Sequence, residues 1–260
     1  MQNFKTLAIV VFLTAIMASC QKNSLIPGSD STNAVSETAA RTLAPGFSGY
    51  PEFWIDPKNF VVGINNQYFP LTPGDTFFYQ NVVDDTVVED IYVTTTHDVK
   101  VVEGISCEVI HDVVTTKGTL TEDTYDYYAQ DINGDVWYFG EDTKSLQEDG
   151  TFSTAGSFTA GVDGAKAGVT MLSNPSANIG QTYRQEWLPG QAEDQAKVIS
   201  TNETVTIGLG TYNNCLHTQE ITMLEKGVVE NKWYAPGIGQ ILTTVTQGGN
   251  EREELIGTNK

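Results

Sequence analysis

The chain has 260 residues and carries 33 acidic side chains against 14 basic ones, a formal net charge of −19. Such an acidic protein is repelled by phosphate backbones, so nucleic acid is not expected as a partner, and anionic membrane surfaces repel it too. Hydrophobic residues make up 40% of the sequence. That content is enough for a folded domain with its own core.

The N-terminus predicts a lipoprotein signal peptide over residues 1–19. Lys5 precedes an apolar run from Leu7 to Ala18, too short to span a bilayer and long enough for a signal-peptide core. Met17-Ala18-Ser19-Cys20 follows and resembles a bacterial lipobox, which implies cleavage before Cys20 and its acylation with fatty acids such as palmitate. The alternative is an ordinary signal peptide with an accidental cysteine. Since Gln21 stands where inner-membrane lipoproteins of enterobacteria tend to have Asp, an outer-membrane anchor is predicted.

Two further parts follow the signal peptide. Residues 20–49 are rich in Ser, Thr, Ala, Asn and Gly, so they are predicted to form a flexible tether behind the lipid on Cys20. That lipid is the predicted contact with the membrane. Residues 50–260 have the length and apolar content of one β domain, and neither an internal repeat nor a linker divides them.

Runs of β-branched and aromatic residues between turn signals predict an all-β domain. Consecutive strands joined by tight turns favour a single large antiparallel meander sheet, curved or barrel-like. Only Ala192–Val198 has any helical periodicity. The expected strands are Thr76–Val83, Val87–Thr95, Val99–Val102, Ser106–Thr115, Thr119–Asp131, Val136–Glu141, Thr182–Trp187, Thr204–Ile207, Cys215–Leu224, Val228–Tyr234, Gly239–Thr246 and Arg252–Ile256.

The segment from Thr121 to Asp142 combines aromatic and acidic residues most densely. It is predicted to form one long β-hairpin that turns at Asn133-Gly134. With those two residues as the loop, the register places three pairs opposite each other on one face, beside Glu122: Asp126 with Glu141, Tyr128 with Phe139, and Gln130 with Trp137.

Like charges opposed across a strand pair destabilise it, so the pair Asp126 and Glu141 requires an explanation. Three explanations are open: side chains splayed into water, a shared proton, or a bound hard cation such as calcium. A metal site would use Glu122, Asp126 and Glu141, with Asp163 from a glycine-rich loop, Thr151–Gly180, packed on the sheet. That loop equally fits a cover over an exposed strand edge. No cofactor is required.

The side chains of Tyr128, Gln130, Trp137 and Phe139 are predicted to form the floor of a ligand site on which sugar rings stack, although aromatic residues in strands also fit a core. Opposed strand carboxyls reach the ~5 Å separation that retaining glycosidases use, so glycoside hydrolysis is an alternative function. No histidine has metal-ligand spacing, and no G-x-S-x-G motif is present. No catalytic residue is assigned.

Two cysteines remain once Cys20 is lipidated. Cys107 and Cys215 each lie in an expected strand, in a compartment where disulfides persist. A Cys107–Cys215 disulfide and two separately buried thiols are both compatible with the sequence.

Tyr128-Ala129-Gln130-Asp131 is followed by Val136-Trp137-Tyr138-Phe139-Gly140-Glu141-Asp142, and the chain also holds the stretches 68–74, 160–165, 183–186, 192–194 and 234–239. In these stretches it resembles a family of uncharacterised bacterial secreted proteins and lipoproteins. The resemblance implies no established activity, cofactor or catalytic residue. It adds Glu186 to the ligand-binding candidates and directs attention to a set of acidic positions: Glu122, Asp126, Asp131, Glu141, Asp163, Glu186, Glu193 and Asp194.

Together these features predict a lipid-anchored outer-membrane protein that faces the periplasm or the cell surface. Its β domain is predicted to be a binding or interaction module with an acidic, aromatic-lined site for calcium, a glycan or a protein partner. Two alternatives are a carboxylate-dependent hydrolase of envelope or dietary glycans, and a structural envelope protein without a small ligand.

Overall fold

The computed structural model describes residues 55–260, so the predicted signal peptide, tether and Cys20 lie outside the described residues. The described part is almost entirely β-structure, with two short 3-10 helices, η1 (Pro57–Asn59) and η2 (Pro175–Asn178). No helix in residues 55–260 has the length and apolarity needed to cross a membrane. The strands are β1 (Phe60–Val61), β2 (Ile64–Asn66), β3 (Phe69–Leu71), β4 (Thr76–Val83), β5 (Thr86–Val102), β6 (Ile105–Thr116), β7 (Thr119–Asp131), β8 (Val136–Leu146), β9 (Phe152–Ser153), β10 (Phe158–Thr159), β11 (Lys166–Met171), β12 (Thr182–Arg184), β13 (Glu186–Trp187), β14 (Asp194–Ile207), β15 (Gly210–Thr222), β16 (Val229–Ala235), β17 (Gly239–Gln247) and β18 (Arg252–Thr258).

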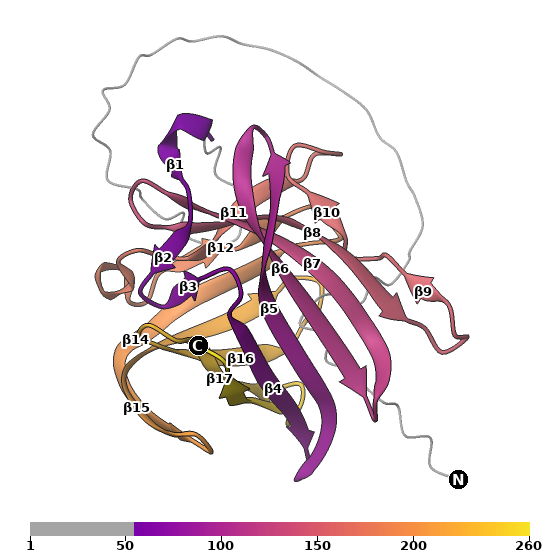
Figure 1. Ribbon diagram of the computed structural model, residues 1–260. Coiled ribbons are helices and arrows are strands. Elements are labelled where there is room, and N and C mark those ends of the chain that lie inside the picture. Colours follow the sequence, from indigo (N-terminus) through magenta and orange to yellow (C-terminus); the bar gives the residue numbers. More distant parts are fainter. Residues whose placement is uncertain (1–54) are drawn as a thin grey trace.

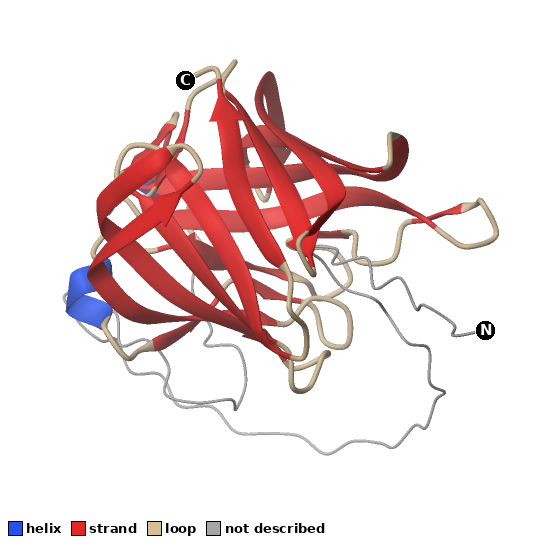
Figure 2. Ribbon diagram, turned by 90° about the horizontal axis from the view of Figure 1, so that it is seen from below, coloured by secondary structure: helices blue, strands red, loops and turns tan. Residues whose placement is uncertain are grey.

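Sixteen of these strands form one antiparallel sheet that is nearly closed into a barrel. β4 to β8 pair in chain order, β14 to β18 do the same, and β18 returns beside β4. Figure 1 shows β4–β8 along one wall and β14–β17 along another, and Figure 2 shows how the sheet curls. The remaining gap is bridged by residues 182–187, since β12 pairs with β14 and β13 pairs with β11.

This architecture confirms the predicted all-β meander. The strands expected at Thr76–Val83 and Thr119–Asp131 have the observed bounds. The helical periodicity at Ala192–Val198 was misleading, because Asp194 to Val198 belong to β14, which pairs with both β12 and β15. The glycine-rich loop also differs from expectation: besides covering the sheet it supplies β9, β10 and β11, and β11 extends the sheet next to β8.

A separate hairpin of β2 and β3 is fastened beside the end of β7. The amide of Asn66 donates to the carbonyl oxygens of Gly134 and Leu172, at 2.9 and 3.2 Å. Phe69 packs edge-on against Tyr128, which lies on β7 and points into the barrel, with ring centroids 5.2 Å apart. The β2–β3 hairpin therefore contributes part of the wall around the barrel interior.

Candidate functional site

The β7–β8 hairpin confirms the predicted pairing of Asp126 with Glu141, although its turn and its register near the turn differ from the prediction. The turn is one residue longer than predicted, because the backbone N–H of Asp131 donates to the carbonyl of Asp135 and only Gly134 has a positive φ. The Asp131 carboxylate stabilises this longer turn by accepting hydrogen bonds from the backbone N–H groups of Asn133 and Asp135.

A β-bulge next to Gly140 then restores the register. Gly140 has a φ of 132°, and a Cβ there would lie 2.2 Å from the carbonyl oxygen of Phe158, so only glycine lets β10 pair with β8. Beyond the bulge, Tyr138 and not Phe139 faces Tyr128. The shift by one residue exchanges the two faces of the strand.

The exchange overturns part of the predicted aromatic floor. Trp137 and Phe139 lie on the face opposite to Tyr138, and both rings pack edge-on against Phe60 in a hydrophobic core. The amide of Gln130 is used to hold β2, since it donates to the side chain of Asn65 and accepts from its backbone, both at 2.8 Å. Of the four predicted floor residues, only Tyr128 lines the barrel interior.

The barrel interior contains a cavity of about 170 Å³, which we call the lumen. Apolar side chains from β3 to β6 form one part of its wall, and carboxyl groups and tyrosines from β6 to β8 and from β13 to β18 form the rest. The lining residues include Phe69, Leu71, Val93, Ile110, Asp112, Asp126, Tyr128, Tyr138, Glu186, Asp194, Glu220, Lys232, Tyr234, Gln240 and Glu253. Six of these residues are acidic and one is basic.

Tyr138 joins two of the buried acids. Its hydroxyl oxygen lies 2.6 Å from Asp126 Oδ1 and 2.9 Å from Glu141 Oε2. A tyrosine hydroxyl has a single proton to donate, so both contacts are hydrogen bonds only when one carboxyl group is itself protonated. The geometry therefore matches the shared-proton explanation for this opposed acidic pair.

Glu186 is the most deeply buried acid of the lumen, with 1% of its surface exposed. Its Oε1 accepts a hydrogen bond of 3.3 Å from the backbone N–H of Asp194, and its Oε2 has no hydrogen-bond partner. Gly168 on β11 allows the backbone before Glu186 to approach closely, because a Cβ on residue 168 would lie 2.3 Å from the backbone of Gln185. The segment that closes the barrel thus carries an unsatisfied carboxylate into its interior.

Lys232 is the only basic residue of the lumen wall. Its ammonium lies 2.7 Å from Glu220 Oε2 and 3.6 Å from Glu230 Oε2. Glu220 also accepts hydrogen bonds from the hydroxyls of Thr218 and Tyr234, at 3.1 and 3.2 Å. This one acid is fully satisfied, and within residues 55–260 no ion pair reaches Asp126, Glu186 or Asp194.

Burial changes the proton affinity of these groups. Desolvation raises the pKa of Asp126 and Asp194 to about 7. Hydrogen bonds from the hydroxyls of Tyr138 to Asp126 and of Thr222 to Asp194 offset part of that rise. Burial, and after it the neighbouring charge of Asp126, raises the pKa of Glu141 well above its usual range. Burial, and after it the neighbouring charge of Asp194, raises the pKa of Glu186 well above its usual range. Near neutral pH the lumen therefore holds several protons that exposed carboxyls would release.

The predicted metal ligands do not all meet. Glu122, Asp126 and Glu141 share one face of the β7–β8 hairpin, and the hydroxyl of Thr124 donates to Glu122. Asp163 is exposed in a turn that lines a separate surface pocket, and it does not line the lumen. Among the described residues no group of three or more His, Cys, Asp or Glu side chains is placed to hold a metal ion.

Other acidic candidates have local structural roles. Asp131 organises the hairpin turn and accepts from the Trp137 indole at 3.2 Å. Glu193 accepts from the backbone N–H of Gly190 at 2.8 Å. Sequence reasoning missed Asp112, Glu220, Lys232 and Glu253, although each is a polar residue at a position that strand alternation assigns to the interior.

Cys107 and Cys215 are both buried free cysteines in the structure. Cys107 packs in the same core as Phe139, whereas Cys215 packs in a second core beside Ile241. Of the two alternatives that the sequence left open, the structure has the two separately buried thiols and no disulfide between Cys107 and Cys215.

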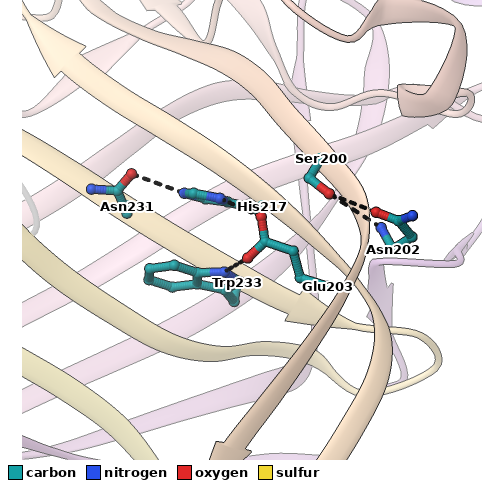
Figure 3. A network of polar contacts seen from close by, with 6 residues as sticks. All are labelled: Ser200, Asn202, Glu203, His217, Asn231 and Trp233. Carbon is teal, nitrogen blue, oxygen red and sulfur yellow. Dashed lines mark hydrogen bonds and ion pairs between the residues drawn. The ribbon is translucent and has the colours of Figure 1, made fainter.

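A second polar cluster, which we call the outer network, lies on the other face of β15 and β16. The His217 ring has its Nδ1 2.8 Å from Glu203 Oε1 and its Nε2 2.8 Å from Asn231 Oδ1, and it stacks on Trp233. The Trp233 indole donates to the other Glu203 oxygen at 2.6 Å (Figure 3). Ser200 nearby bonds to Asn202 instead of His217, so no nucleophile–base hydrogen bond is formed.

No protein-family model matches the sequence, and no curated protein is significantly similar to it. Among solved structures, a protein from Bacteroides fragilis assigned as exported, with a YmcC-like fold, is 15% identical, with a TM-score of 0.46 over 75% of this chain and 100% of that one. A protein from Parabacteroides distasonis assigned as a lipoprotein is 12% identical, with a TM-score of 0.44 over 75% of this chain and 99% of that one. The family resemblance in the sequence stays a prediction.

Proposed function

We propose that this protein is a lipid-anchored binding protein of the cell envelope that holds a small molecule inside its β-barrel. The observation that carries the proposal is the lumen, a cavity of about 170 Å³ in which the buried oxygens Glu186 Oε2, Asp194 Oδ1 and Asp112 Oδ1 have no hydrogen-bond partner. Ligand sites are typically concave and largely apolar, with a few converging polar groups.

The energetic cost of these buried acids supports a binding role over a purely structural one. Moving a carboxyl group from water into a protein interior without a hydrogen-bond partner costs about 1–3 kcal/mol in proteins. Three such oxygens in one cavity lower the stability of the empty barrel without contributing to its packing. A ligand that donates hydrogen bonds to them recovers part of that cost.

A screen for small-molecule binding tests this function. The purified protein is mixed with amines, alcohols, carboxylic acids and monosaccharides, and the amide signals of the chain are followed by NMR. We expect a ligand to shift the signals of β13 and β16 around Glu186 and Lys232, and to leave those around His217 in the outer network unchanged. If no compound shifts the lumen signals at millimolar concentration, the structural alternative replaces a binding function.

The proposed anchor rests on the sequence around Cys20. Growth of cells with an alkyne-labelled palmitate should label the protein, and Cys20→Ala should abolish the label. Fractionation of the cell envelope then distinguishes the outer membrane, which Gln21 favours, from the inner one. Label retained in the Cys20→Ala variant would contradict lipidation at this residue.

Calcium is a second candidate ligand, since Glu122 Oε2 and Glu141 Oε1 are buried on one face without hydrogen-bond partners. Calcium takes six to eight oxygen ligands. Thermal unfolding with chelator and then with calcium tests this assignment. A ligand that binds only the folded state at a hundred times its Kd adds about 2.7 kcal/mol. An unchanged midpoint would remove calcium from consideration.

A further inference from the structure

The lumen has two chemically different sides. Phe69, Leu71, Val93 and Ile110 present aromatic and aliphatic surface from β3, β5 and β6. Carboxyl groups line the other side, where β13 and β14 meet at the segment that closes the barrel. A molecule that fills this cavity must therefore have an apolar part and a polar part that faces carboxylates.

The carboxylate side has fewer hydrogen-bond donors than its carboxyl oxygens can use. Glu186 lines the lumen at 1% exposure, and its Oε2 has no hydrogen-bond partner. Asp194 Oδ1 is also buried without a partner. The Asp126 carboxyl shares one tyrosine proton with Glu141. These three lumen acids have no lysine, arginine or histidine within ion-pair distance in the described part of the chain.

Lys232 shows how the same wall accommodates a cation. Its ammonium is held between Glu220 and Glu230, at 2.7 and 3.6 Å, and the flanking hydroxyl of Tyr234 bonds to Glu220. Asp126 and Glu186 have no ion pair in the described part of the chain, and Lys232 acts on Asp194 electrostatically without an ion-pair contact. A nitrogen cation from a ligand would complete them in the same way, with charge-assisted hydrogen bonds.

We infer that the ligand of the lumen is an organic cation that carries an ammonium or guanidinium group on an apolar body, with the charged end against Glu186, Asp194 and Asp126. This inference rests on the proposed binding function and specifies its ligand class. A bare metal ion leaves the apolar half of the cavity unused, and no metal-holding group is found among the described residues. A neutral sugar supplies hydrogen bonds but no charge to offset the acids.

Three matched probes separate these chemistries: n-hexylamine carries both features, n-hexanol has the same chain without charge, and ethylamine has the charge without the chain. Affinities are measured by NMR titration of the purified protein at pH 7.5. We expect n-hexylamine to bind at least about tenfold more tightly than either control, the factor that one charge-assisted contact contributes.

Substitutions in the protein test which carboxyl group contacts the charged end of the ligand. Glu186→Gln keeps the shape of the side chain and removes its ability to ionise beside a bound cation, and should weaken n-hexylamine roughly tenfold while leaving n-hexanol unchanged. Glu89→Gln is the matched control, because Glu89 is a buried acid of β5 that bonds to Asn81 and does not line the lumen. Asp194→Asn provides a second test if Glu186→Gln lowers the yield of folded protein.

Each result has a definite meaning. Tight binding of n-hexylamine that depends on Glu186 and not on Glu89 supports an organic cation. If n-hexanol binds as tightly, or if Glu186→Gln has no effect on n-hexylamine, the inference about the charge is wrong, and the binding function remains. If none of the three probes binds at millimolar concentration, the organic cation is rejected, and the wider screen decides whether the lumen binds any ligand.

Discussion

The lumen and the outer network lie on opposite faces of the same strands, and both contain acidic side chains. In the outer network both carboxylate oxygens of Glu203 are within 2.8 Å of a ring nitrogen, one in His217 and one in Trp233. In the lumen, Glu186 is more deeply buried but has one unpartnered oxygen.

This difference separates two uses of buried polar groups. A satisfied network fixes the packing of neighbouring strands and contributes to stability. An unsatisfied group costs stability, and is tolerated where a binding partner supplies what the chain lacks. The outer network contains a histidine and a glutamate, residue types that are common in active sites. Because its polar groups are satisfied, we assign it the structural role of holding β14, β15 and β16 together. The lumen is the better candidate for binding.

The largest expected effect comes from opening the barrel at Gly168, which would expose the lumen acids to water. Gly168→Val places a Cβ within 2.3 Å of the Gln185 backbone, so β13 cannot pair with β11. We expect loss of more than about 4 kcal/mol of stability, or failure to fold. Gly257→Ala is the control, because its Cβ meets only Phe78 at 3.6 Å and should cost below about 1 kcal/mol. Urea unfolding of both variants measures the difference, and equal losses would refute the tight approach at Gly168.

The second expected effect is a dependence of stability on pH that arises from buried acids in the lumen and from Glu122 beside them. Burial raises the pKa of Glu122, Asp126, Asp194 and Glu253 to about 7. Between about pH 4 and 7 the folded protein therefore binds more protons than the unfolded chain, so stability is greatest at the acidic end and falls as pH rises through 7. The slope is about 1.4 kcal/mol per pH unit for each extra proton bound.

Thermal unfolding from pH 4.5 to 8 measures this fall. Repulsion among the exposed acids of this chain, with its net charge of −19, also lowers stability as pH rises. That contribution is screened by salt, whereas the buried groups are screened much less. We therefore expect most of the fall to persist in 0.5 M sodium chloride. A curve that becomes flat in salt would assign the effect to the surface and not to the lumen.

A pair of isosteric substitutions should change stability in opposite directions at pH 8. Glu186→Gln removes a buried acidic group that has an unpartnered oxygen, and we expect a gain of about 1 kcal/mol. Glu203→Gln weakens two charge-assisted hydrogen bonds, and we expect a loss of about 1–2 kcal/mol. Urea unfolding curves test the pair. Changes of the same sign in both variants would contradict the distinction between the lumen and the outer network.

The sequence was sufficient for the fold because strand alternation and turn residues are local signals. The sequence also predicted the pairing of Asp126 with Glu141 correctly. It did so because two differences from the predicted hairpin offset each other: the turn is one residue longer, and a bulge next to Gly140 restores the register. The bulge depends on the approach of Phe158 from β10, which no pattern within the hairpin records. For that reason Trp137 and Phe139 were assigned to the wrong face.

The membership of the lumen depends on barrel closure and was only partly predictable. Glu186 and Asp194 were named from a family resemblance, and the geometry that brings them together comes from the pairing of β13 with β11 and of β12 with β14. Glu220 and Lys232 carry a usable signal. Each is a charged residue at an inward position: Glu220 shares a strand face with buried Thr218, and Lys232 shares one with buried Tyr234. Such a residue needs a partner, but the sequence does not say which distant strand provides it.

The smallest expected effect separates two tyrosines on opposite faces of the β7–β8 hairpin. Tyr138→Phe removes the hydroxyl between Asp126 and Glu141, and we expect a loss of about 1 kcal/mol at pH 8. At pH 5 the loss should be smaller, because both carboxyls, whose pKa burial raises, then carry their own protons. Tyr125→Phe is the control, since Tyr125 stacks on His111 through its ring and its hydroxyl makes no hydrogen bond within residues 55–260. Unfolding of both variants at the two pH values measures this. A loss for Tyr138→Phe that is independent of pH would mean that the hydroxyl acts through packing, and that no proton is shared between Asp126 and Glu141.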